Sequence, residues 1–227
     1  MAAGPVLDHA APEPVRTFAP RWRNSPLTDA RIATLLPARV LPEGPLVPAE
    51  AFGRVGPVVL EIGSGHGAAA IAFCASHPEV DLVAAEVHVP GVARMLAAAQ
   101  DAGVDNLWVH PGDAVPFLTD RVAPASLDAV HLFFPDPWPK HRHAKRRFLQ
   151  QRTLELLASR LVPGGVLRVA TDSARYAAHA RAQLSRHGRW SVVEGERPAW
   201  RPDDGFEAKG LRAGREVTEL TCTLRPA

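Results

Sequence analysis

A short glycine-rich segment near residue 60 carries an acid just ahead of it, after an apolar run. The segment is Glu61-Ile62-Gly63-Ser64-Gly65-His66-Gly67. Glycines between a strand and a helix allow a tight turn, and their backbone amides can approach a ligand closely. Gly63, Gly65 and Ala68 also have the spacing of a dinucleotide-binding loop, so the glycines alone fit several nucleoside ligands. Glu61 would repel a pyrophosphate and would suit a ligand that carries an amino group or a sulfonium.

Two further acids follow the next two apolar runs. Glu86 stands at the end of the second run, where a carboxylate can accept hydrogen bonds from both hydroxyls of a ribose. Asp113 follows the third run in Gly112-Asp113-Ala114 and could accept from the exocyclic amine of an adenine, or could be a plain turn residue. The carboxyl ends of parallel strands share one edge of a sheet, so these acids are expected to lie together.

A proline-rich motif ends the fourth apolar run. It reads Leu132-Phe133-Phe134-Pro135-Asp136-Pro137-Trp138-Pro139-Lys140. Three prolines in five residues stop the strand and keep the chain extended, which fixes Asp136 at the strand's end. A rigid carboxylate beside an exposed aromatic ring suits recognition of a nucleic-acid base, because the carboxylate accepts from amino groups and the ring stacks. A proline-rich loop around a buried Trp138 is the alternative.

The next segment is strongly basic. Between Pro139 and Arg152 the chain holds six Lys or Arg and no acid. These cations flank the predicted start of a helix, where the helix dipole disfavours positive charge, so the run indicates phosphate contacts rather than helix capping. A solvated basic face is the alternative. His141 and His143 stand among cations and are poor metal ligands, so we expect no metal site.

Two later segments add candidate residues. Asp172 ends the fifth apolar run at the same predicted edge. The segment from Arg201 to Glu207 combines acids, an aromatic residue and a turn glycine without helical or strand periodicity. Loops of that composition can carry function.

The elements that position these residues alternate between strand and helix. Apolar runs predict strands at 58–62, 81–87, 106–110, 127–134 and 166–170. Helices are predicted from the glycine loop to about residue 76 and at 27–36, 90–102, 115–120, 146–161 and 174–187. Two last strand-like runs, 190–193 and 217–224, have no predicted helix between them and indicate an antiparallel pair. The pattern predicts an α/β fold with a doubly wound, mostly parallel, seven-stranded sheet.

Composition narrows the class of protein. The chain has 227 residues, of which 22% are charged, and this composition argues against disorder. Its two cysteines are too few for a disulfide framework or a multi-cysteine zinc site. We expect a proline-rich, partly mobile extension over 1–50 and one domain over 51–227. No apolar run approaches the roughly 20 residues needed to span a bilayer. The start lacks a secretory signal pattern. We therefore expect a cytoplasmic protein without a membrane partner.

These motifs together resemble the bacterial tRNA (guanine(46)-N7)-methyltransferase family. The motifs that carry the resemblance are the glycine loop with Glu61, Glu86-Val-His-x-Pro-Gly91, the stretch from Phe133 to Lys140, the run from Arg142 to Arg147, and Ala170-Thr-Asp172. The resemblance extends from about Val58 to the C-terminus. It implies a Rossmann-like class I methyltransferase fold, S-adenosylmethionine as cofactor, and tRNA as substrate, methylated at guanine N7 in the variable loop.

The resemblance also implies roles for residues at matching positions. The cofactor would be held by Glu61, Gly63, Gly65, Gly67, Glu86, Asp113 and Asp136, and Asp136 would also be the catalytic residue. The substrate would be bound by Lys140, Asp172, Asp204, Gly205, Phe206 and Glu207. The RNA backbone would be contacted by Arg142, His143, Lys145, Arg146 and Arg147. The family has a threonine where this chain has Asp204.

Two other classes of protein are weaker alternatives. A nicotinamide-dependent oxidoreductase is disfavoured by Glu61 and by the lack of a Tyr-x-x-x-Lys pair, since Tyr176 is the only tyrosine. A non-catalytic RNA-binding protein would not need the glycine loop together with the strand-end acids. The net charge of +2 would itself indicate no nucleic-acid partner, but it averages the basic run against the acids of the predicted cofactor site.

Overall fold

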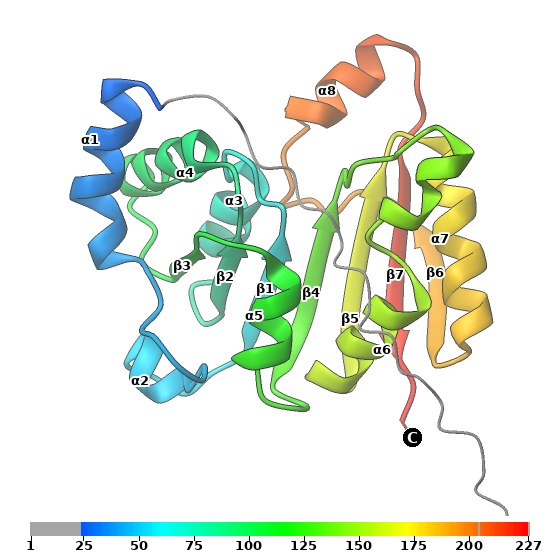
Figure 1. The fold of residues 1–227 in the computed structure, drawn as a ribbon, viewed down its shortest axis with the longest axis horizontal. Helices are drawn as coiled ribbons and strands as arrows, with labels where there is room; N and C mark the ends of the chain where they lie inside the picture. The colour runs from blue at the N-terminus through cyan, green and yellow to red at the C-terminus, as the bar shows by residue number, and fades with distance from the viewer. Residues whose placement is uncertain (1–23, 204, 227) are drawn as a thin grey trace, which may run out of the picture.

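A single mixed sheet organises the molecule. The structure, a computed structural model, describes residues 24–203 and 205–226. The strands are β1 (Val58–Ile62), β2 (Asp81–Ala85), β3 (Leu107–His110), β4 (Leu127–Phe133), β5 (Leu161–Thr171), β6 (Trp190–Gly195) and β7 (Thr218–Leu224). Their order in the sheet is β3-β2-β1-β4-β5-β7-β6 (Figure 1).

The strand directions confirm the predicted fold class. Strands β1 to β5 run parallel to one another, while β7 is antiparallel to both β5 and β6. The direction in which successive strands are added to the sheet reverses between β1 and β4. Strands β2 and β3 lie on one side of β1, whereas β4 and β5 lie on its other side. Doubly wound sheets bind ligands at such a reversal, beyond the carboxyl ends of the strands.

Helices cover both faces of the sheet. They are α1 (Pro26–Leu35), α2 (Pro48–Phe52), α3 (Ala68–Ser76), α4 (Val89–Asp101), α5 (Ala114–Asp120), α6 (Gln151–Arg160), α7 (Ala174–His187) and α8 (Gly205–Arg212), with 3₁₀ turns η1 (Leu36–Ala38) and η2 (His141–Arg146). One apolar core joins α3 and α4 to the sheet, and a second joins α5, α6 and α7. No helix in the described part of the chain is long and apolar enough to cross a membrane.

The helix predicted over 146–161 begins later than expected. Residues His141–Arg146 form η2 instead, and α6 starts at Gln151. The start is fixed by a reciprocal pair: the Thr153 backbone donates to the Gln150 side chain, and the Gln150 backbone donates to the Thr153 hydroxyl at 3.0 Å. Most of the basic run therefore lies in and around η2, ahead of α6, and only Arg152 stands in the first turn of that helix, so the argument from the helix dipole does not apply to the run as a whole.

The last two strands are not joined by a plain loop. Helix α8 lies between β6 and β7, where the sequence predicted no helix. It stands above the edge of the sheet at which β4 and β5 end (Figure 1). The expected antiparallel pairing of the two strands is confirmed, from Trp190 opposite Leu224 to Gly195 opposite Glu219.

The segment before β1 packs against the sheet. Helix α1 contacts α4, and Val40 forms a bridge with Val109 on β3. The Leu41 amide donates to the Val109 carbonyl at 3.3 Å, and the Val109 amide donates to the Arg39 carbonyl at 2.8 Å. The domain boundary near residue 51 stays a prediction. The tail predicted over residues 1–15 lies outside the described residues.

Candidate active site

The first acid of the site is buried at the end of β1. Glu61 is 2% exposed, and its Oε2 has no hydrogen-bond partner among the described residues. His131 on β4 lies closest, with Nδ1 at 3.8 Å from that oxygen. Burial lowers the pKa of His131, which keeps the imidazole neutral near pH 7. Glu61 is thus a buried carboxylate without a cationic partner, which is costly unless a positive ligand completes it.

The glycine loop is shaped by the second acid. The Gly65 amide donates to Glu86 Oε2 at 2.7 Å, and the His88 amide donates to Oε1 at 2.7 Å. A carboxylate has about four acceptor positions, so two remain for a ligand's hydroxyls. Gly67 has φ of +84°, and a Cβ there would meet the Met95 side chain at 2.3 Å, so only glycine fits.

Asp113 is the N-cap residue of a helix in this structure. Its carboxylate accepts from the Val115 amide at 2.9 Å and caps the N-terminus of α5. It follows β3 at the same edge of the sheet as Glu61 and Glu86. Capping uses one of the acceptor positions of its carboxylate, and its contact with an adenine amine stays a prediction.

The proline-rich loop forms one wall of an open cavity. Asp136 is exposed and lines a cavity of about 700 Å³, together with Phe134 and Asp172. The backbone of Phe134 has φ of +48° and that of Trp138 has φ of +40°. Such values cost about 1–3 kcal/mol each in non-glycine residues, and they concentrate at functional sites. The strained loop therefore presents Asp136 to the cavity at an energetic cost.

Asp172 faces Asp136 across the same cavity from the end of β5. Its Oδ2 accepts from Arg215, from Nε at 2.9 Å and from Nη2 at 2.8 Å. Arg215 also lines the cavity, and the sequence had not indicated it because nothing in its neighbourhood marks it. Lys140 is exposed where the proline-rich loop meets η2. The cavity thus combines three carboxylates, those of Asp136, Asp172 and Glu216, with an aromatic wall and the guanidinium of Arg215.

The basic run separates into exposed and buried members. Lys140, Arg142 and Lys145 are exposed. Arg146 lies over the Trp138 ring at 4.8 Å, and the His143 ring meets the edge of the same indole. Arg147 is 5% exposed and donates to loop carbonyls, from Nε to Pro137 at 3.0 Å and from Nη2 to Trp138 at 3.3 Å. Arg147 thus stabilises the proline-rich loop through these hydrogen bonds instead of facing solvent.

The segment from Arg201 to Glu207 is organised by ion pairs. Glu207, on α8, is buried, and its Oε2 lies 3.0 Å from Arg201 Nη2. Arg197 Nε lies 3.5 Å from Glu207 Oε1. Arg201 also pairs with Glu219 at the start of β7. Asp204 and the side chain of Phe206 lie outside the described residues, so their predicted contacts with substrate stay predictions.

A second, smaller cavity lies at the glycine loop. It measures about 110 Å³, below the roughly 300–1,000 Å³ usual for small-molecule sites, so it fits one end of a nucleoside cofactor. Glu61, the glycine loop, Arg201 and Gly205 line it. Phe134 lines this cavity and the larger one alike, so the two cavities adjoin at this residue. A group passing between a cofactor and a substrate would cross at Phe134.

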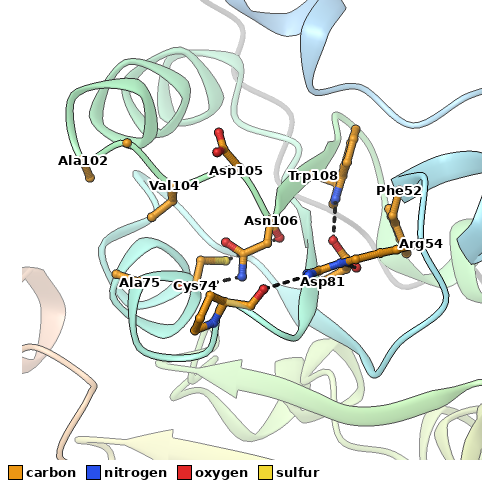
Figure 2. A pocket seen from close by; sticks show the side chains of 12 residues that line it. Phe52, Arg54, Cys74, Ala75, Asp81, Ala102, Val104, Asp105, Asn106 and Trp108 are labelled. Carbon is orange, nitrogen blue, oxygen red and sulfur yellow. Dashed lines mark hydrogen bonds and ion pairs between the residues drawn. The ribbon is translucent and has the colours of Figure 1, made fainter.

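A third cavity, of about 570 Å³, opens at the opposite edge of the sheet (Figure 2). Asp81, at the start of β2, accepts from Arg54 Nε at 2.7 Å and from the Trp108 indole at 3.1 Å. Asn106 Nδ2 reaches three backbone carbonyls, at 2.7 to 3.2 Å. These polar groups are used in holding the sheet's amino edge together. No acid of the predicted site lies there.

The described residues contain no cluster of three or more His, Cys, Asp or Glu that could hold a metal ion. Both cysteines are free and buried. Burial raises the pKa of Cys222 to about 12 and raises that of Cys74 as well, so neither thiol is activated as a nucleophile.

Comparison with known sequences identifies close relatives. A family model described as "Putative methyltransferase" matches residues 55–220. The tRNA (guanine-N(7)-)-methyltransferase of Nitrosomonas eutropha is 43% identical over 195 residues, which are 84% of this chain and 87% of that protein. The same enzyme of Halorhodospira halophila is 47% identical over 77% of this chain and 78% of its own length, and that of Nitrosospira multiformis is 40% identical over 95% and 96%.

Solved structures agree on the fold. The 16S rRNA methyltransferase KamB superposes with a TM-score of 0.58 at 15% identity and covers 83% of this chain and 99% of its own. The 16S rRNA (adenine(1408)-N(1))-methyltransferase of Catenulisporales acidiphilia gives a TM-score of 0.54 at 16% identity, over 80% and 92%. At this identity the likeness concerns the fold alone.

Proposed function

Because the chain belongs to the tRNA (guanine-N(7)-)-methyltransferase family, we propose that it methylates N7 of guanosine 46 in the variable loop of tRNA with S-adenosylmethionine. One observation carries the proposal. Two cavities, one at the glycine loop and one at Asp136, adjoin at Phe134, which lines both of them. This is the arrangement that direct transfer between a cofactor and a base requires.

The residues at the glycine loop fit the cofactor. S-adenosylmethionine supplies a methyl group activated by a positively charged sulfur. Glu61, buried without a cation, suits its ammonium group, and the spare acceptor positions of Glu86 suit the ribose hydroxyls. Asp113 stands at the end of the neighbouring strand and suits the adenine amine.

The residues of the larger cavity fit a flipped guanine. Guanine N7 carries a lone pair and no proton, so no side chain has to act as a base. Asp136 and Asp172 orient the base through its N2 amino group and N1–H, and Asp136 stabilises the positive charge that develops on it. The base leaves its stack to reach them, at a cost of a few kcal/mol. The exposed members of the basic run hold the phosphates beside the cavity.

The test combines product identification with one variant. The full chain is incubated with unmodified tRNA and labelled cofactor, and the nucleosides are analysed by mass spectrometry. We expect 7-methylguanosine at position 46. Asp136→Asn should still bind the cofactor measurably, while kcat falls by about 100-fold or more because the charge at the base is lost. Asp120→Asn, at an exposed position at the end of α5, is the matched control and should retain activity. Absence of any methylated nucleoside, or full turnover by Asp136→Asn, would contradict the proposal.

A further inference from the structure

Arg201 is a buried cation whose hydrogen-bonding capacity is only partly used. It is 2% exposed and lies in the loop between β6 and α8. Its guanidinium stacks on the rings of Phe133 and Phe134, at 4.8 and 5.3 Å from their centroids. These contacts place the guanidinium against the aromatic side chains at the end of β4. The rings also remove water from it, which makes each unused donor costly.

Only one nitrogen of Arg201 has partners. Nη2 pairs with Glu207 and Glu219, whereas Nε and Nη1 are buried and have no hydrogen-bond partner among the described residues. A buried donor left without an acceptor costs about 1–3 kcal/mol, more when it is charged. Both two-bond carboxylate faces of a guanidinium include Nη2, so Nε and Nη1, which point to different sides of the group, can each donate a single charge-assisted hydrogen bond to a carboxylate.

The cavity that Arg201 lines also contains the unpaired Glu61. One small space is thus bordered by a carboxylate without a cation and by a guanidinium with free donors. An α-amino acid carries the complementary pair, an ammonium and a carboxylate, and adds no net charge to the site. The cavity's size of about 110 Å³ suits such an end group.

We propose that Arg201 binds the α-carboxylate of the cofactor's amino-acid end by a charge-assisted hydrogen bond from Nε or Nη1, opposite the ammonium held by Glu61. This rests on the proposed function, since it takes S-adenosylmethionine as the cofactor. Because Nη2 of the same guanidinium holds Glu207, Arg201 also fixes α8 relative to the bound cofactor.

The test is a binding cycle on the full chain that does not depend on turnover. Calorimetry compares S-adenosylhomocysteine with its decarboxylated form, in the parent and in Arg201→Gln. The parent should lose at least about tenfold in affinity when the carboxylate is removed, as expected for a charge-assisted contact. Arg201→Gln should bind both ligands with similar, weak affinity. Arg197→Gln is the matched control, because Arg197 also pairs with Glu207 but does not line the cavity, and it should discriminate as the parent does.

The outcomes separate the two proposals. If Arg201→Gln still loses affinity on decarboxylation as strongly as the parent, the role of Arg201 is refuted while the cofactor assignment stands. If the parent binds neither ligand, the cofactor assignment fails. If Arg201→Gln does not fold, a crystal structure of the parent with S-adenosylhomocysteine decides. A carboxylate oxygen within about 3.2 Å of Nε or Nη1 supports the proposal, and a carboxylate held elsewhere overturns it.

Discussion

Arg147→Ala should destabilise the protein without changing how its tRNA affinity depends on salt. The side chain is buried and makes two hydrogen bonds from a charged group to the carbonyls of Pro137 and Trp138. Each such bond contributes about 1.5–3 kcal/mol. Pro137 is exposed, so water can replace part of the loss, and the lower end of the range applies to each bond. We therefore expect the free energy of unfolding to fall by about 3 kcal/mol.

The measurements are thermal unfolding and tRNA binding at several salt concentrations. For a chain of this length, 1 kcal/mol shifts Tm by about 2–4 °C, so the expected fall is about 6–12 °C. Arg142→Ala is the control, because Arg142 is exposed in the same run. It should change stability by less than about 0.5 kcal/mol and reduce the salt slope of tRNA binding by about 0.7–0.9. The reasoning fails if Arg147→Ala melts with the parent and loses salt slope as Arg142→Ala does.

Two further predictions concern stability. Asp81→Ala should lower the free energy of unfolding by about 3 kcal/mol in urea titrations, because Arg54 and the Trp108 indole lose the carboxylate that accepts from both. KM for tRNA should stay unchanged. A urea midpoint equal to that of the parent would contradict this prediction. Burial lowers the pKa of His131 below its ordinary value of 6.5 in the folded protein. Below pH 6.5 the unfolded chain therefore binds a proton at this histidine more readily than the folded chain does. The free energy of unfolding should consequently fall as the pH drops from 6.5 toward the pKa of the folded state. Unfolding followed between pH 7.5 and 5.5 should show a shallower decline for His131→Asn; an equal decline would exclude His131 as a source.

The sequence predicted the parallel half of the sheet well, because its strands are short runs of apolar residues separated by glycines and helices. The glycine loop was equally clear, since positive φ at Gly63, Gly65 and Gly67 leaves few alternatives to glycine. The shared edge of the acids followed from the parallel order alone.

Helix α8 could not be predicted in the same way. It contains Gly205 and Gly210, both poor helix formers, and the described contacts hold it by the ion pair between Arg201 and Glu207. Arg147 was predicted to contact RNA, and its burial was not foreseen for a similar reason: nothing local distinguishes a basic residue that hydrogen-bonds a loop from one that faces solvent. Both depend on tertiary contacts that bury a guanidinium, and such contacts leave no periodicity in the sequence.

The bridge between Val40 and Val109 has a consequence for the protein while it is being synthesised. β3 is the edge strand of the sheet, and an open edge can pair with another chain and lead to aggregation. Residues Arg39 to Leu41 supply hydrogen bonds to that edge, and they leave the ribosome well before β3 does. When the edge strand emerges, the segment that covers it is already present in the same chain. Residues Arg39 to Leu41 thus shield an edge that would otherwise be exposed during synthesis.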